Sequence, residues 1–115
     1  MNEQTKDLLF ASGKNDSTMV QKLLEDGRAD PTALDNFAIR LSARNGYDKV
    51  VKLLLDWVGP NGIRVDPTAD DNYAINVSAN EGHDKVVKLL LEDGRADPAS
   101  DNNSAIKFCA VYCNL

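Results

Sequence analysis

The chain contains few residues of the kinds that form covalent cross-links or metal sites. Its 115 residues include one histidine and two cysteines, Cys109 and Cys113. Because both cysteines lie near the C-terminus, they cannot close a large loop, and we expect them to be reduced thiols. A closed zinc site needs about four ligands, which this pair does not supply. We therefore expect neither a metal nor another cofactor.

Long hydrophobic runs and an excess of positive charge are also missing. No apolar stretch approaches the roughly 20 residues that span a bilayer, and residues 1–7 lack the basic start of a signal peptide. Thirteen Lys and Arg against 18 Asp and Glu give a formal net charge of -5, which would repel nucleic-acid phosphates. We expect a cytoplasmic protein with no membrane or nucleic-acid partner, and the charge favours a basic protein partner.

An internal repeat accounts for nearly the whole sequence. Residues 24–31 recur letter for letter as residues 91–98. When residues 30–55 are aligned with residues 66–91, 19 of 26 positions are identical. The last two Asp-Pro pairs lie 31 residues apart and the first two 36, because the second copy carries five additional residues around positions 59–62. Self-similarity at a fixed period predicts a solenoid of stacked units.

Each copy carries two helical patterns. In the second copy we expect a first helix over residues 37–45, with Asn36 as its N-cap and Gly46 as its stop. A second helix follows over residues 49–55, capped by Asp48, with a broad apolar face. Trp57 and Val58 extend that face, so we expect this helix to run one turn longer than in the other copies.

These patterns predict a single all-α domain. Its copies cover approximately residues 1–29, 30–65, 66–96 and a half copy at 97–115. Lys22 in the first copy replaces the apolar Leu53 of the second, as expected for a terminal copy with one face in water. The Asp-Pro-Thr-Ala-Asp segments are rich in residues that bend the chain, and we expect them to form the projecting loops between copies.

The helical stretches at residues 43–55 and 82–91 resemble the ankyrin repeat. The period is 31 instead of about 33, and the family's Thr-Pro-Leu-His is replaced at residues 37–40, 73–76 and 104–107. The Asp-Asn-x-Ala-Ile variant is similar to ankyrin repeats of large DNA viruses and single-celled eukaryotes. The resemblance implies an ankyrin-like helix-turn-helix solenoid that binds proteins on a concave surface of inter-repeat loops and first helices.

Candidate catalytic groups do not form a recognisable set. His83 precedes a second helix, where a side chain that hydrogen-bonds to the backbone is the simplest interpretation. Asp66, Asp70 and Asp71 lack the glycine and distal glutamate of a calcium loop. No nucleophile, base and orienting group can be combined with these. We expect the chain not to be an enzyme.

The differences between the second and third copies all precede the second helix. Positions 37, 40, 41 and 44 have the spacing of one helix face, and Leu41, which aligns with Val77, is expected in the core. The alternative is neutral drift at exposed sites, but aligned aromatic residues favour an interface. The predicted protein-binding residues are Leu34, Phe37, Arg40, Arg44, Asp70, Tyr73, Asn76, Asn80 and Lys107.

The function predicted from these observations is a non-catalytic protein-interaction module or scaffold. The alternative is the amino-terminal recruiting segment of a longer enzyme or ubiquitin-ligase adaptor. A further expectation concerns the half copy, whose apolar residues lack the cover of a second helix of their own. We predict that the chain either self-associates there or is stabilised by extension through a complete fourth repeat.

Overall fold

Helices follow one another along the chain in the order that the 31-residue period predicts. The computed structural model describes residues 1–113 and contains no strand within them. The α-helices are α1 (Glu3–Gly13), α2 (Ser17–Asp26), α3 (Ala33–Asn45), α4 (Asp48–Asp56), α5 (Ala69–Asn80), α6 (Asp84–Asp93) and α7 (Ser100–Tyr112), and a short 3-10 helix, η1, covers Pro60–Gly62. The prediction of an all-α solenoid is confirmed.

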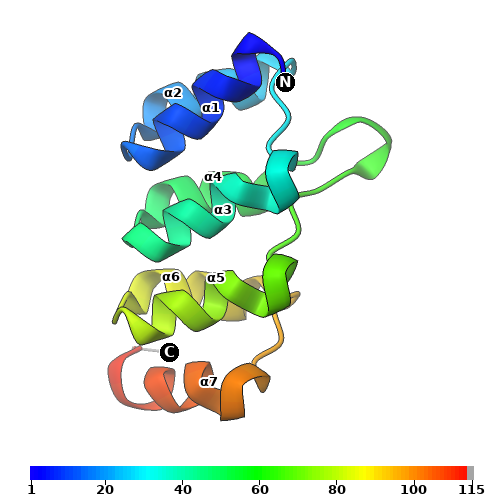
Figure 1. Cartoon of the computed structure of the whole chain (residues 1–115). Helices are drawn as coiled ribbons and strands as arrows, with labels where there is room; N and C mark the ends of the chain where they lie inside the picture. Colours follow the sequence, from blue (N-terminus) through cyan, green and yellow to red (C-terminus); the bar gives the residue numbers. More distant parts are fainter. Residues whose placement is uncertain (114–115) are drawn as a thin grey trace.

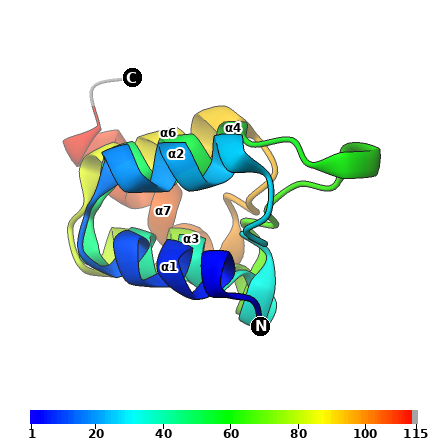
Figure 2. The same cartoon turned by 90° about the horizontal axis from the view of Figure 1, so that it is seen from above.

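The helices form two layers (Figures 1 and 2). α1, α3, α5 and α7 pack side by side in the helix-one layer, and α2, α4 and α6 pack in the helix-two layer. The stack measures 40 × 25 × 20 Å. Contacts between neighbouring copies therefore hold the molecule together, as in other repeat proteins.

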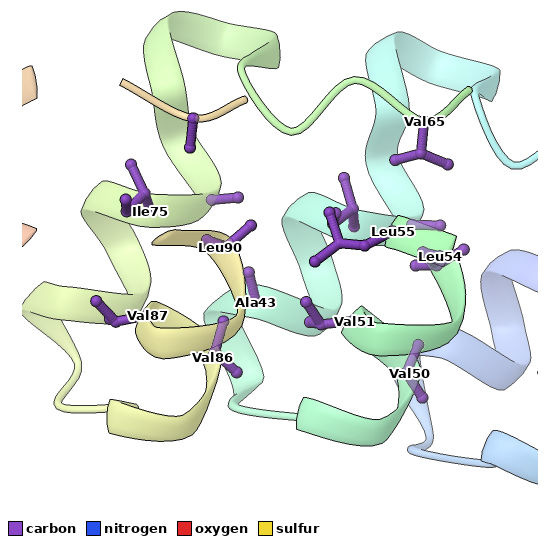
Figure 3. Packing of buried hydrophobic residues seen from close by; sticks show 14 of the residues in the cluster. Ala43, Val50, Val51, Leu54, Leu55, Val65, Ile75, Val86, Val87 and Leu90 are labelled. Atoms are coloured by element: carbon purple, nitrogen blue, oxygen red, sulfur yellow. The ribbon is translucent and has the colours of Figure 1, made fainter. Parts of the chain in front are cut away.

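The core lies between the two layers and continues from one copy to the next (Figure 3). Val50, Val51 and Leu54 of α4 are fully buried, and their counterparts in α6 are equally enclosed. Ile39 and Ile75 of the helix-one layer are also fully buried and belong to the same cluster. Because burying one such side chain contributes about 1.5–3 kcal/mol, the second helices, which are identical over residues 48–55 and 84–91, form the stabilising frame.

Three consecutive left-handed residues open α3, α5 and α7. At Leu34, Asp35 and Asn36 the φ angles are 56°, 55° and 59°, and residues 70–72 and 101–103 repeat this turn. Asp and Asn tolerate this conformation better than other non-glycine residues, which explains why the Asp-Asn pairs recur. The segments between copies are thus compact left-handed turns.

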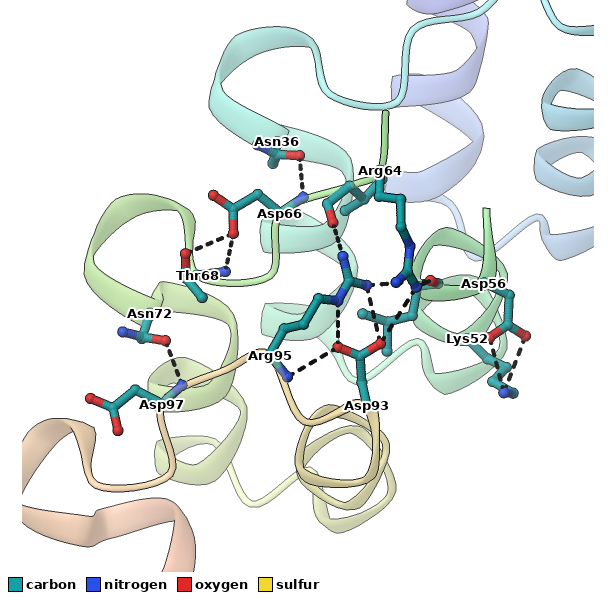
Figure 4. Close-up of polar contacts among 12 residues, drawn as sticks. Asn36, Lys52, Asp56, Arg64, Asp66, Thr68, Asn72, Asp93, Arg95 and Asp97 are labelled. Atoms are coloured by element: carbon teal, nitrogen blue, oxygen red, sulfur yellow. Dashed lines mark hydrogen bonds and ion pairs between the residues drawn. The ribbon is translucent and has the colours of Figure 1, made fainter. Parts of the chain in front are cut away.

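The side chain of Asn36 bonds to the next copy instead of capping its own helix. Its Oδ1 accepts a hydrogen bond from the amide of Asp66 at 2.8 Å (Figure 4). Asn72 accepts from Asp97 in the same way at 2.9 Å. The prediction of Asn36 as an N-cap is wrong, because the left-handed turn directs this side chain to the following repeat.

Asp48 is likewise not the cap predicted for the second helix. It is the first residue of α4, and the capping position belongs to Tyr47, which makes no side-chain cap bond. The aligned residue of the first copy, Asp16, does cap α2, since its carboxylate accepts from the amide of Met19 at 3.1 Å. The capping position therefore varies in chemistry from copy to copy.

The second helix of the second copy is not longer than its counterparts. α4 ends at Asp56, and Trp57 already has an extended backbone. The left-handed glycines that end α2 and α6, Gly27 and Gly94, have no equivalent here. The chain leaves the helix directly for the inserted loop, which projects from the stack (Figure 1). The indole ring lies so close to Gly59 that a side chain there would collide with it.

The two cysteines are joined. A disulfide links Cys109, buried in α7, to Cys113 just beyond the end of that helix. The expectation of reduced thiols is therefore wrong for this structure, although the bond closes only a short loop, as their spacing requires.

Candidate functional site

Five side chains from two neighbouring copies surround one hollow in the helix-one layer. The hollow lies between α3 and α5 and has a volume of about 200 Å³. Its walls are Phe37, Arg40, Leu41, Arg44 and Tyr73. We refer to it as the aromatic hollow. Four of these five residues are among the predicted binding residues, and the fifth, Leu41, is half-buried in the wall instead of lying in the core.

Arg40 is the central residue of the aromatic hollow. Its guanidinium carbon lies 5.4 Å from the ring centre of Phe37 and 5.9 Å from that of Tyr73. It also donates hydrogen bonds of 3.0 Å to the carbonyl oxygens of Leu34 and Asp35. Each contact between the guanidinium and a ring contributes about 0.5–2 kcal/mol. Together the two contacts hold the aromatic side chains in place.

The next copy uses Asn76 where the second copy uses Arg40. Its Nδ2 donates to the Asp71 carbonyl at 3.3 Å and to Ser100 Oγ at 2.9 Å. Both side chains thus close the left-handed turn before their own helix. The residue at this position differs between the two copies, but in both copies its side chain donates a hydrogen bond to a backbone carbonyl of the turn.

The remaining predicted residues are spread over the layer. Leu34 is exposed, and the Asp70 carboxylate lies 3.9 Å from the Arg40 guanidinium. Asn80 borders a second hollow of about 470 Å³, together with Phe108 and Tyr112. Lys107 is exposed on α7. The structure therefore unites the α3 residues with Asp70 and Tyr73 but not with the residues nearer the C-terminus.

His83 connects two copies through the backbone. Its Nε2–H donates to the carbonyl oxygen of Arg44 at 2.9 Å, which confirms the expected bond to the backbone. The ring also covers Gly46, where a Cβ would lie 2.6 Å from Nδ1. Gly46 has a φ of 78°, so this position requires glycine for two reasons.

Sequence reasoning missed an arginine that recurs in each copy before Asp-Pro. Arg95 donates to the Val65 carbonyl at 2.8 Å and to Asp93 at 2.8 Å (Figure 4). Arg64, its counterpart, donates to the carbonyl of Leu55 at 2.7 Å. The bond from Arg95 to Val65 anchors the end of the inserted loop to the following copy, whereas the bond from Arg64 to Leu55 closes the loop on its own copy. The signal in the sequence was the repeated Arg-x-Asp-Pro.

The same arginine in the first copy has a local partner. Arg28 pairs with Asp26 at 2.7 Å and its side chain is 67% exposed. Its hydrogen bond holds the pKa of the Asp26 carboxyl below the ordinary value. The identical residues 24–31 and 91–98 thus share one ion pair, Arg28 with Asp26 and Arg95 with Asp93. Only Arg95 also donates to carbonyl oxygens of a preceding copy.

A hollow on the helix-two layer was also missed. It has a volume of about 410 Å³, and Leu53 and Leu89 form its apolar part. Ser17, Gln21 and Lys52 belong to its polar part. Its residues from α4 and α6 lie in the segments 48–55 and 84–91, which are identical, so differences between the second and third copies do not point to it.

The aspartate of each Asp-Pro pair accepts a local hydrogen bond from the backbone. Asp66 accepts from the amide of Thr68 at 2.9 Å and from its hydroxyl at 2.7 Å. Across residues 1–113, no three His, Cys, Asp or Glu side chains are grouped as a metal site would require. In that same part of the chain, no helix has the length and hydrophobicity to cross a membrane.

Comparison with known proteins agrees with this architecture. A family model described as ankyrin repeats (3 copies) matches residues 8–102. No curated protein matches the chain. Since the family match covers most of the sequence and the paired helices follow its repeats, the chain belongs to the ankyrin repeat family.

Proposed function

We propose that this chain is a non-catalytic, cytoplasmic interaction module or scaffold that binds a protein through its helix-one layer and the adjoining turns. Ankyrin repeats are generally protein-protein interaction modules. The observation that carries the proposal is the aromatic hollow, where Phe37, Arg40 and Tyr73 from two copies meet. Aromatic and arginine side chains dominate the binding energy of many protein interfaces.

The two layers differ in how much their sequences vary between copies, and this difference also supports binding through the helix-one layer. All seven differences between residues 30–55 and 66–91 precede the second helix. A fixed frame with variable side chains in front of it is what a binding surface of repeats requires. The predicted binding residues Leu34, Asp70, Asn76, Asn80 and Lys107 remain part of this proposal as the margin of the surface.

Affinity capture from a lysate of source cells tests the proposal. The double variant Phe37→Ala and Tyr73→Ala removes both aromatic walls, and we expect it to lose the captured protein. The control is Lys49→Glu with Lys85→Glu, two exposed lysines of the helix-two layer. Retention by the aromatic variant and loss by the lysine variant would contradict the proposal. Thermal melts of both variants check that folding is intact.

The net charge of -5 supports a protein over a nucleic acid as the partner. The chain as the recruiting segment of a longer enzyme or ligase adaptor remains a second proposal, tested by the length of the natural reading frame. Self-association through α7 is a third, supported by the exposure of Ile106, Val111 and Tyr112. Sedimentation at rising protein concentration decides it.

A further inference from the structure

The size of the aromatic hollow indicates what it can hold. Small-molecule sites usually measure about 300–1,000 Å³, whereas this hollow measures about 200 Å³ and is open between two helices. Its walls combine two aromatic rings with the apolar Leu41. A single bulky apolar side chain of a partner protein fits this space better than a free ligand does.

The two arginines of the hollow differ in the number of partners that their guanidinium groups have. Arg40 is held by two carbonyl oxygens and by the rings on both sides, and only 19% of its side chain is exposed. Arg44 is exposed, and within residues 1–113 its guanidinium has no hydrogen bond or ion pair. An unpaired guanidinium beside an apolar hollow is suited to bind a carboxylate with two parallel bonds.

Charge is distributed unevenly over the chain. The right-handed parts of α3, α5 and α7, residues 37–45, 73–80 and 104–112, contain three basic residues and no acidic one. The left-handed turns that precede these parts carry Asp35, Asp70, Asp71 and Asp101, so the positive charge is confined to the right-handed strip. The carboxylate of Asp70 at the edge of the hollow faces Arg40 at 3.9 Å, which leaves Arg44 as the available cation.

We propose that the aromatic hollow receives a bulky apolar side chain of the partner and that Arg44 pairs with an aspartate or glutamate beside it. The inference rests on the proposed function and specifies the chemistry of the partner. The net charge alone favours a basic partner, but the local charge of the strip favours an acidic segment, because contacts at the interface act at short range.

Selection from a library of random-sequence peptides displayed on phage tests the inference on the whole chain. We expect the enriched peptides to carry an acidic residue next to Phe, Leu, Ile, Met or Trp. Arg44→Gln should weaken the binding of a selected peptide about tenfold or more. Arg44→Lys should restore only part of it, since lysine cannot form the paired bonds. Lys85→Gln, the matched control on the helix-two layer, should leave binding unchanged.

Amide chemical shifts recorded with the selected peptide separate the possible failures. Peptides without an acidic preference that still shift residues 34–47 and 70–83 would overturn the inference and leave the proposed function standing. Peptides that shift only the helix-two layer would overturn both. A library that yields no enriched peptide, or binding that is insensitive to Arg44→Gln, would also overturn the inference.

Discussion

The side-chain oxygen of Asn36 accepts a hydrogen bond from the backbone amide of Asp66 at 2.8 Å, across 30 residues of sequence. Asn72 and Asp97 repeat the bond, and in the first copy the hydroxyl of Thr5 accepts from the amide of Asp30 at 2.8 Å. One bond of the same kind thus joins each copy to the next. The bond stabilises the stack at the side where the left-handed turns lie.

Replacing Asn36 should lower the free energy of unfolding for two reasons, a lost hydrogen bond and backbone strain, which two variants separate. Asn36→Gly keeps the left-handed turn but leaves the Asp66 amide without its acceptor, which should cost about 1 kcal/mol of unfolding free energy. Asn36→Ala should cost about 1 kcal/mol more, because alanine is strained at a φ of 59°. Urea denaturation measures both. Equal stability of the two variants would contradict the left-handed turn.

Gly46 and Gly82 provide a matched pair, since their φ angles are 78° and 79°. Alanine at Gly82 meets no atom within 4 Å, whereas at Gly46 it meets the His83 ring. Gly82→Ala should therefore cost about 1 kcal/mol, and Gly46→Ala about 1 kcal/mol or more beyond that. In a His83→Ala background the excess should vanish. An excess that persists there would show that the ring is not its cause.

Removal of one buried hydroxyl should stabilise the protein. Ser12 is fully buried, and its Oγ has no hydrogen-bond partner within residues 1–113. The aligned residues of the next two copies are Ala43 and Ala79. Ser12→Ala should raise the unfolding free energy by about 1 kcal/mol. Ser42→Ala, which removes a hydroxyl bonded to the Ala38 carbonyl at 2.8 Å, should give no such gain.

Leu34 should show a conflict between stability and binding. It is 60% exposed and left-handed, with a φ of 56°, where the other copies carry Asp70 and Asp101. Leu34→Asn should stabilise the chain by about 0.5–1 kcal/mol. If Leu34 belongs to the binding surface, the same variant should bind the captured partner more weakly. A thermal melt and a titration on one sample measure both effects.

The helices could be predicted because their signals are local or periodic. The apolar spacing of residues 50–55 and their recurrence at 86–91 require only a helix and neighbours of the same kind. The role of Asn36 could not be predicted, because an N-cap and a left-handed turn use the same residue types. What decides between them is a distant amide, that of Asp66.

The candidate site was predictable to a similar extent. Differences between copies directed attention to Phe37, Arg40 and Tyr73, which meet in the structure. They could not reveal that Arg40 and Asn76 also close their own turns. The end of α4 was mispredicted since Trp57 continues the apolar pattern, and only the path of the inserted loop turns it out of the helix.

The central claim is that the helix-one layer is the binding surface and the helix-two layer its frame. The most direct test is an amide chemical-shift map of the isotope-labelled chain, recorded with and without the protein captured from source cells. We expect the largest shifts at residues 34–47 and 70–83, including the amides of Phe37, Arg44 and Tyr73. Shifts confined to residues 17–26, 48–56 and 84–93 would contradict the claim and assign binding to the helix-two layer.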